Sequence, residues 1–220
     1  MKILGERDSF QADHSSASYL FYSPTRLSPA TRTLARKFSS RTRVGAHTSS
    51  YMWHGEYDGF SGGQDVFLLQ DLFEILIKES YDWWTFTVCV PFSQERMKLL
   101  RPFHKTYSDN DCGIYVERIP KADKIRIDIH CALDPDGDWV NDMSGADDDE
   151  FYAEEHGNQG DWPSFSVFVP HLLAFRKELI AGRLTGMQAI AARFDSKRWK
   201  APKAVSKSAR WIAECIDTTI

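Results

Sequence analysis

Cysteine is scarce in this chain: the 220 residues include four, Cys89, Cys112, Cys131 and Cys215, and no two of them form a CxxC pair. That spacing excludes a zinc ribbon and a thioredoxin-like redox motif, and it favours reduced thiols in a cytoplasmic protein. No apolar run approaches the roughly 20 residues of a bilayer-spanning helix, so we expect no membrane segment. The first residues contain acids and no apolar core, which argues against a secretory signal.

The motifs of common enzyme classes are also missing, namely the P-loop, GxGxxG, GxSxG and HExxH. His54-Gly55-Glu56 matches half of the zinc-deaminase pattern, but its PCxxC partner is absent. Asp134 to Asp138 (DPDGD) has its glycine at the wrong position for an EF-hand, and adjacent Asp13, His14 and Ser15 cannot aim at one another as a catalytic triad. We therefore assign no catalytic residue, metal or cofactor, and an unrecognised enzyme is kept only as an alternative.

The composition itself is that of a globular protein. Hydrophobic residues make up 42% of the chain, including 14 Phe, 8 Tyr and 7 Trp, and charged residues make up an ordinary 26%. The length fits one large domain. We divide the chain into an α+β part over residues 1–133, an acidic loop over 134–161, and a helical C-terminal part over 162–220 that packs on the same domain.

The net charge of −4 conceals a strong separation of charge along the chain. Residues 127–175 contain twelve acids and no Lys or Arg. Residues 14–55 contain no acid and six cations: Arg26, Arg32, Arg36, Lys37, Arg41 and Arg43. Residues 196–213 also contain no acid and six cations: Lys197, Arg198, Lys200, Lys203, Lys207 and Arg210. Such blocks are commonly solvated surface, but they also predict faces that attract a polyanion or an acidic partner.

Two β-hairpins can be predicted with their register. A turn at Tyr81-Asp82 pairs Ser80 with Trp83, and Ile77 and Ile75 then face Phe86 and Val88. A loop over residues 120–123 pairs Val116 with Ile127 and Ile114 with Ile129, and it places Glu117 opposite Arg126. Both registers gather apolar side chains on one face, which is what fixes the register of a half-buried sheet.

The remaining elements follow from periodicity and caps. We expect strands over 19–23 and 43–57, and an amphipathic helix over 29–39 with Ala30, Leu34 and Phe38 along its apolar stripe. Further helices are expected over 65–72, over 93–100 with Ser93 as its cap, and over 165–180 despite Pro170. A Thr185–Gln188 capping box and a final apolar stripe predict helices over 186–194 and 205–216. The fold class is therefore α+β, a mostly antiparallel sheet with hairpins at 73–91 and 112–132, covered by helices.

Several short motifs together resemble a known group. They are YxFxxxxRLSP at residues 19–29, Ser39-Ser40-Arg41, YxWxGEY at 51–57 and ESYDWW at 79–84. The set resembles an uncharacterised family of bacterial proteins loosely associated with SWIM zinc-finger proteins, and the resemblance covers about residues 10–185. The family has no established activity, so the resemblance implies no catalytic residue. Residues 134–161 stand where the family has a compact loop.

Three single features have two interpretations each. His130 falls on the polar face of its strand, where exposure is favoured over acid–base chemistry. Cys112 and Cys131 should lie opposite each other as buried thiols, although oxidation could join them. Trp53, Trp83, Trp84 and Tyr51 are more typical of a core than of a stacking platform for single-stranded nucleic acid.

We therefore expect a non-catalytic binding or regulatory module. Its basic face over residues 26–43 would bind nucleic acid or an acidic partner, assisted by the basic stretch near the C-terminus. The alternative is a protein-interaction protein that acts through its acidic residues 134–161. No membrane partner is expected.

Overall fold

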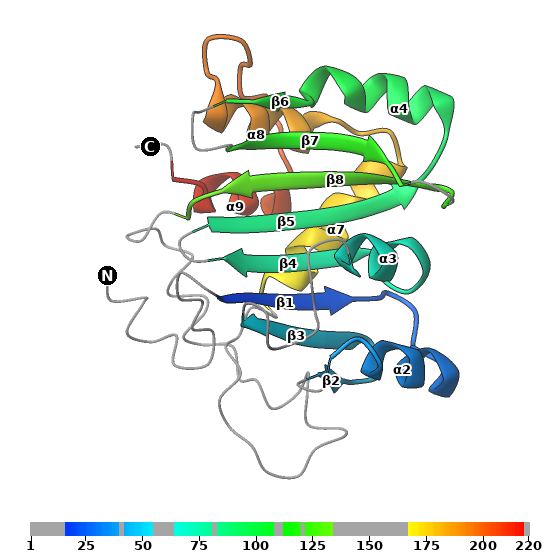
Figure 1. The fold of residues 1–220 in the computed structure, drawn as a ribbon. Helices are drawn as coiled ribbons and strands as arrows, with labels where there is room; N and C mark the ends of the chain where they lie inside the picture. Colours follow the sequence, from blue (N-terminus) through cyan, green and yellow to red (C-terminus); the bar gives the residue numbers. More distant parts are fainter. Residues whose placement is uncertain are drawn as a thin grey trace.

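The computed structural model describes residues 16–39, 42–54, 64–80, 83–107, 112–119, 122–133 and 167–217. Its framework is an eight-stranded sheet in the order β2-β3-β1-β4-β5-β8-β7-β6, and every neighbouring pair is antiparallel (Figure 1). Helices pack on both faces of this sheet, so the α+β fold class is confirmed. None of the helices in the described ranges is long and apolar enough to cross a bilayer.

The elements run as follows. The strands are β1 (Ser16–Tyr22), β2 (Arg43–Val44), β3 (Thr48–His54), β4 (Ile75–Ser80), β5 (Trp83–Pro91), β6 (Lys105–Thr106), β7 (Gly113–Arg118) and β8 (Lys124–Cys131). The helices are α2 (Pro29–Arg36), α3 (Gln64–Asp71), α4 (Gln94–Leu100), the 3₁₀ helix η2 (Arg101–Phe103), α7 (Phe168–Ile180), α8 (Thr185–Phe194) and α9 (Lys207–Cys215).

Both predicted hairpins are confirmed in their register. In the first hairpin Ile75 pairs with Val88 and Ser80 with Trp83. In the second, Val116 pairs with Ile127 and the polar pair Glu117–Arg126 lies on the opposite face. The two hairpins are joined through β5 and β8, so that they form the centre of the sheet.

One face of the sheet is covered by the C-terminal helices α7, α8 and α9 (Figure 1). Phe168 of α7 packs on Trp84 and Phe86 of β5, with ring centroids 6.0 and 4.8 Å apart, and Phe175 is buried in the same core. Pro170 stands in the first turn of α7, where its missing N–H costs no helical hydrogen bond. The helix is followed by Gly182, whose φ of 74° lies in the left-handed region that glycine favours.

The opposite face carries a second core that the sequence analysis did not predict. Phe21, Tyr51 and Leu76 of the sheet are buried there beneath Ala35 of α2 and Leu68 of α3. The Tyr51 hydroxyl donates a 2.9 Å hydrogen bond to the Ala35 carbonyl and so attaches α2 to the sheet. This half of the sheet is therefore buried on both faces.

Three local expectations are wrong in detail. The expected strand over 43–57 is interrupted at residues 45–47 and divides into β2 and β3, and its last residues lie outside the described ranges. The expected apolar stripe of α2 is only partly buried: Leu34 remains 37% exposed, Phe38 is half-buried against the second core, and it is Ala35 that is fully buried. Helix α8 forms, but the Thr185 capping box is absent from it, because Leu184 occupies the N-cap position and makes no side-chain hydrogen bond there.

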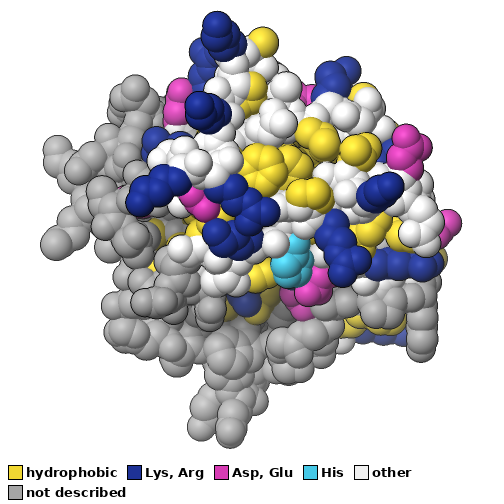
Figure 2. All heavy atoms as spheres, turned by 90° about the horizontal axis from the view of Figure 1, so that it is seen from above, with side chains coloured by type: hydrophobic (Ala, Val, Ile, Leu, Met, Phe, Trp, Pro, Cys, Tyr) yellow, Lys and Arg dark blue, Asp and Glu magenta, His cyan; other side chains and the backbone are white. Residues whose placement is uncertain are grey.

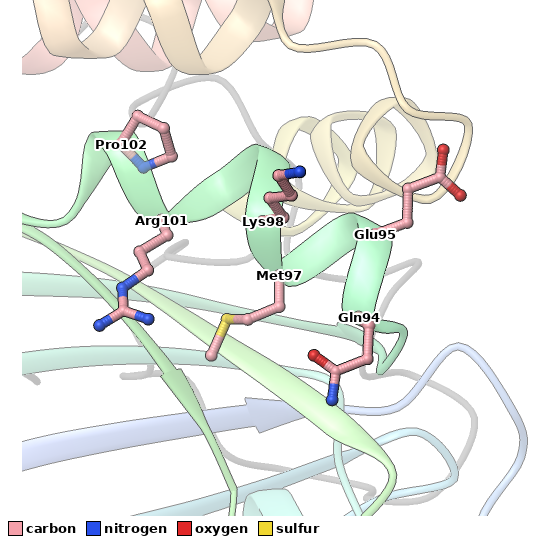
Figure 3. Close-up of a pocket in the computed structure, with 6 residues that line it drawn as sticks. All are labelled: Gln94, Glu95, Met97, Lys98, Arg101 and Pro102. Carbon is pink, nitrogen blue, oxygen red and sulfur yellow. The ribbon is translucent and has the colours of Figure 1, made fainter.

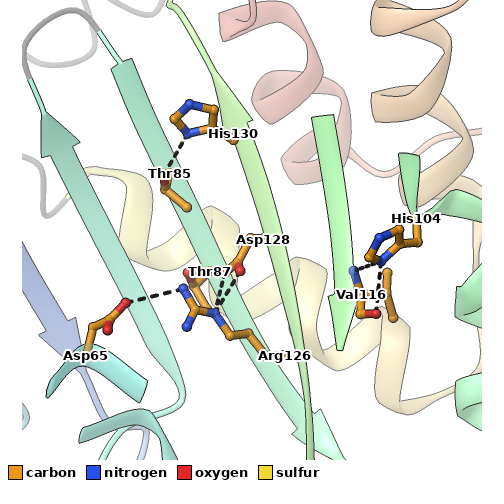
Figure 4. A network of polar contacts seen from close by, with 8 residues as sticks. All are labelled: Asp65, Thr85, Thr87, His104, Val116, Arg126, Asp128 and His130. Atoms are coloured by element: carbon orange, nitrogen blue, oxygen red, sulfur yellow. Dashed lines mark hydrogen bonds and ion pairs between the residues drawn. The ribbon is translucent and has the colours of Figure 1, made fainter. Parts of the chain in front are cut away.

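Both edge strands of the sheet, β2 and β6, are only two residues long. Beyond β6, the His104 ring takes the place of a strand neighbour for Val116: the Val116 N–H donates to His104 Nδ1 over 3.0 Å (Figure 4). Where β6 pairs with β7, position 113 has no room for a side chain, because a Cβ on Gly113 would lie 2.4 Å from the Lys105 carbonyl oxygen. The edge is thus closed by local contacts rather than by a long strand.

Candidate functional site

The basic residues predicted over 26–43 lie around α2 and β2 at one edge of the sheet (Figure 1). We call the described members of this group the α2 face: Arg26, Arg32, Arg36, Lys37 and Arg43. Arg36 and Lys37 are exposed at the C-terminal end of α2 and make no ion pair with a described residue. Arg41 lies outside the described residues, as does the whole of 134–161.

A second basic surface is formed at the opposite edge of the sheet. It consists of α4, η2 and β6 together with residues 195–203, and we call it the β6-edge surface. The Lys105 ammonium forms a 3.2 Å ion pair with Asp195, and the Phe103 and Trp199 rings stack at 4.6 Å. These contacts join segments about ninety positions apart in the sequence.

The β6-edge surface has far more cations than acids. Residues 94–106 and 195–203 contain eight Lys and Arg against two acids, Glu95 and Asp195. Figure 2 views this edge from above and shows Lys and Arg side chains spread across the face and around a central apolar area. Five exposed cations make no ion pair with any residue in the described ranges: Lys98, Arg101, Lys197, Lys200 and Lys203.

The other cations of this surface have structural contacts. Arg96 donates hydrogen bonds to the carbonyls of Pro91 and Ile180 and so attaches α4 to β5 and α7. The Arg198 guanidinium lies 5.5 Å from the Trp199 ring centroid. The Arg198 N–H and the Lys105 ammonium lower the pKa of the Asp195 carboxyl, which therefore stays ionised at neutral pH and offsets one charge.

A shallow, open hollow of about 730 Å³ follows α4 on this surface (Figure 3). Its lining residues are Gln94, Glu95, Met97, Lys98, Arg101 and Pro102. Figure 3 shows Gln94, Met97 and Arg101 pointing to one side of the helix, and Glu95 and Lys98 to the other. Two unpaired cations and one acid give the hollow a net positive charge, which suits an anionic group.

A cluster of ionisable groups on the sheet near α3 is already paired internally (Figure 4). The Arg126 Nε lies 2.7 Å from an Asp128 carboxylate oxygen, and its Nη2 lies 3.4 Å from Asp65 of α3. The Thr87 hydroxyl donates a 2.5 Å hydrogen bond to Asp128. Burial raises the pKa of the Asp128 carboxyl above its usual range, although Arg126 acts in the opposite direction. The arrangement fastens α3 to the sheet, and none of these groups lines the hollow.

The single features noted in the sequence mostly have structural roles. Trp84 and Tyr51 are buried in the two cores, Trp83 is half-buried against the His130 ring, and the Trp53 side chain lies outside the described residues. His130 Nδ1 contacts the Thr85 hydroxyl at 2.9 Å. The four cysteines are buried thiols, and burial raises the pKa of Cys131 well above its usual range and that of Cys89 to about 12.

Sequence reasoning identified half of the β6-edge surface. The basic run at 196–213 was visible as a stretch without acids, and Lys197, Lys200 and Lys203 belong to it. Lys98 and Arg101 were missed because Glu95 and apolar residues interrupt their segment. Their spacing gives no helical signal, because Arg101 follows the predicted helix over 93–100 and points to a different side from Lys98. The signal that could have found them is the charge count of residues 94–106, with four Lys or Arg against one acid.

Comparison of the chain with protein-family models, curated proteins and solved structures gives no match.

Proposed function

We propose that this protein is a non-catalytic binding module whose partner is the phosphate backbone of nucleic acid. The observation that carries the proposal is the β6-edge surface, where Lys98, Arg101, Lys197, Lys200 and Lys203 are exposed and unpaired within the described structure. Two contacts hold this surface in place. Arg96 bonds α4 to the Ile180 carbonyl of α7, and the ion pair of Lys105 with Asp195 bonds residues 195–203 to β6.

Phosphates fit this surface better than bases do. Recognition of single-stranded bases commonly uses aromatic rings whose faces are open for stacking. Here Trp199 is stacked on Phe103 and Tyr107 on Phe194, with centroids 4.6 and 5.2 Å apart. The Arg198 and Lys105 cations also lie over the Trp199 and Tyr107 rings, at 5.5 and 5.0 Å from their centroids, so both rings already have partners. Lys and Arg that position a protein on phosphates carry no sequence information themselves. We therefore expect binding with little sequence preference.

The salt dependence of binding tests the proposal. Each phosphate neutralised by a cation contributes about 0.9 to the slope of log K against log salt concentration for a duplex. If the five exposed cations each contact one phosphate, affinity falls roughly 500-fold between about 50 and 200 mM salt. Fluorescence anisotropy with labelled DNA and RNA duplexes at the two salt concentrations measures this change. Absent binding, or binding indifferent to salt, would refute the proposal.

Charge reversal locates the site. Lys98→Glu with Arg101→Glu should reduce the salt slope by about two and weaken binding of every sequence alike. The matched control is Lys177→Glu with Arg183→Glu, which changes two exposed cations on α7 and just after it by the same charge. Equal losses in both double variants would mean that overall charge, not this surface, governs binding.

An acidic protein partner is a distinct outcome of the same measurement. A polyglutamate chain offers carboxylates at a spacing unlike that of phosphates. If polyglutamate competes at charge concentrations equal to those of the duplex, the partner is an acidic protein and the proposal of nucleic acid is wrong. Polyglutamate that competes only in large excess supports the proposal.

A further inference from the structure

We propose that the protein binds two separate nucleic-acid segments at once, one on the β6-edge surface and one on the α2 face. The proposal rests on the function proposed above. It adds a second binding surface, and it assigns the protein a bridging role that neither surface alone would give.

The two surfaces lie as far apart as the sheet allows. Strands β2 and β6 are the first and last strands of the sheet, with seven strand-to-strand steps between them. At about 4.8 Å per step, this separates the two edges by about 34 Å, less the shortening that twist causes. Figure 1 shows α2 beside β2 at one end of the sheet and α4 beside β6 at the other.

The surfaces also rest on opposite faces of the sheet. Ala35 of α2 and the preceding Leu27 belong to the core shared with α3. Leu100 of α4 and Phe103 of η2 belong to the core shared with α7, α8 and α9. A straight duplex lying on one surface therefore has the sheet and one helical layer between itself and the other surface.

A single duplex cannot bend around the protein to contact both. The persistence length of duplex DNA is about 50 nm, which is more than ten times the separation of the two edges. A bend of 40–90° over 20–30 base pairs already costs about 1–6 kcal/mol, and contact with both edges would need a larger bend over a shorter length. The second surface is therefore available to a second segment while the first is occupied.

The α2 face has charge suited to the same ligand. The chain contains no acid from residue 14 to residue 55, so the charged residues of α2, β2 and β3 are all cations. Arg36 and Lys37 are exposed and make no ion pair with a described residue. Ser28 caps the start of α2 through a 3.1 Å hydrogen bond from the Thr31 N–H, which holds the helix in place.

A capture experiment tests the bridge. One duplex is attached to beads, the protein is added, unbound protein is washed away, and a second, fluorescent duplex is offered. The wild-type protein should retain the second duplex, and retention should fall as salt is raised. Arg36→Glu with Lys37→Glu, and separately Lys98→Glu with Arg101→Glu, should each still bind one duplex in solution but lose capture of the second by at least tenfold. The Lys177→Glu, Arg183→Glu control should capture it like the wild type.

The outcomes separate this proposal from the one it rests on. If the wild-type protein binds no duplex, the proposed function itself is wrong. If it binds one duplex but captures no second, the bridge is wrong and the binding function stands. If reversal on the α2 face leaves capture unchanged while reversal on the β6-edge surface abolishes it, two copies of the chain with one surface each do the bridging, and the second surface is refuted.

Discussion

Replacement of Arg126 by Met is the sharpest test of whether the ion pairs of Arg126 hold helix α3 on the sheet. The guanidinium is the ion-pair partner of both Asp128 and Asp65, over 2.7 and 3.4 Å, and all three side chains are at most 16% exposed. Methionine preserves much of the volume but removes the guanidinium that pairs with both largely buried carboxylates. Breaking a buried pair in this way costs about 3–5 kcal/mol.

Because the three groups are partly hydrated, we expect the lower end of that range, a loss of about 3 kcal/mol in the free energy of unfolding at pH 7. For a chain of this size that lowers Tm by about 6–12 °C. Urea unfolding followed by tryptophan fluorescence measures the loss. Arg118→Met is the matched control, because Arg118 is an exposed arginine on the neighbouring strand β7 whose guanidinium lies over the Phe92 ring. It should cost less than about 1 kcal/mol.

The loss should also depend on pH in a defined direction. Burial already raises the pKa of Asp128 in the native protein, and loss of Arg126 raises it further. A carboxyl whose folded pKa lies above its unfolded value of about 3.9 destabilises the fold progressively as pH rises through that interval. The deficit of the Arg126→Met variant should therefore shrink as pH is lowered from 7 towards 4. A deficit that equals that of Arg118→Met, or that is the same at both pH values, would refute the clamp.

Three further outcomes follow from local geometry. Gly186→Ala should destabilise the helical layer by about 1–3 kcal/mol in urea unfolding, because the added Cβ would lie 2.9 Å from the Ala209 Cβ and 3.0 Å from Phe175; an unchanged midpoint would contradict this packing. Ser93→Ala should lower the free energy of unfolding by about 1 kcal/mol, because Ser93 Oγ accepts the Arg96 N–H at the start of α4. A change in circular dichroism without loss of stability would count against this role of the cap. The Cys89 thiol should react with an aromatic disulfide reagent at pH 8 only after denaturant is added, because burial raises the pKa of this thiol to about 12. Rapid labelling of Cys89 in the native protein would be inconsistent with its burial.

The sheet could be predicted where its chemistry alternates. In β8 the residues from Lys124 to Cys131 alternate between half-buried polar and buried apolar positions, so that only one register brings the apolar ones together. The cap of α4 was also readable, because Ser93 lies one residue before the helix that it caps. These signals are confined to neighbouring residues or to paired strands close in sequence.

The second core could not be predicted in the same way. Strand β4 begins with Ile75-Leu76-Ile77, all fully buried, and a continuous apolar run does not reveal that its side chains alternate between two cores. The apolar stripe predicted for α2 was wrong for a related reason. The small Ala35 is buried against the sheet, and the larger Leu34 stays at the surface. Tertiary packing decided which apolar residues are buried.

The candidate site depended on contacts that no local pattern contains. The pairing of Lys105 with Asp195 and the stacking of Phe103 on Trp199 place residues 195–203 beside α4 and η2. Each segment carries moderate charge by itself, and their combination gives a broad basic surface. Charge along a chain can be read directly, but which charged segments become neighbours is set by the fold.

The two-residue length of β2 and β6 bears on how the protein should behave when it is crowded. A long bare strand at a sheet border offers backbone donors and acceptors to another molecule, and chains then polymerise into ribbons. Here each border ends in a short strand with cationic side chains nearby, and at the β6 border the His104 imidazole accepts the Val116 N–H. Within the described sheet, neither border therefore offers a second molecule of the chain a long backbone template for ribbon growth.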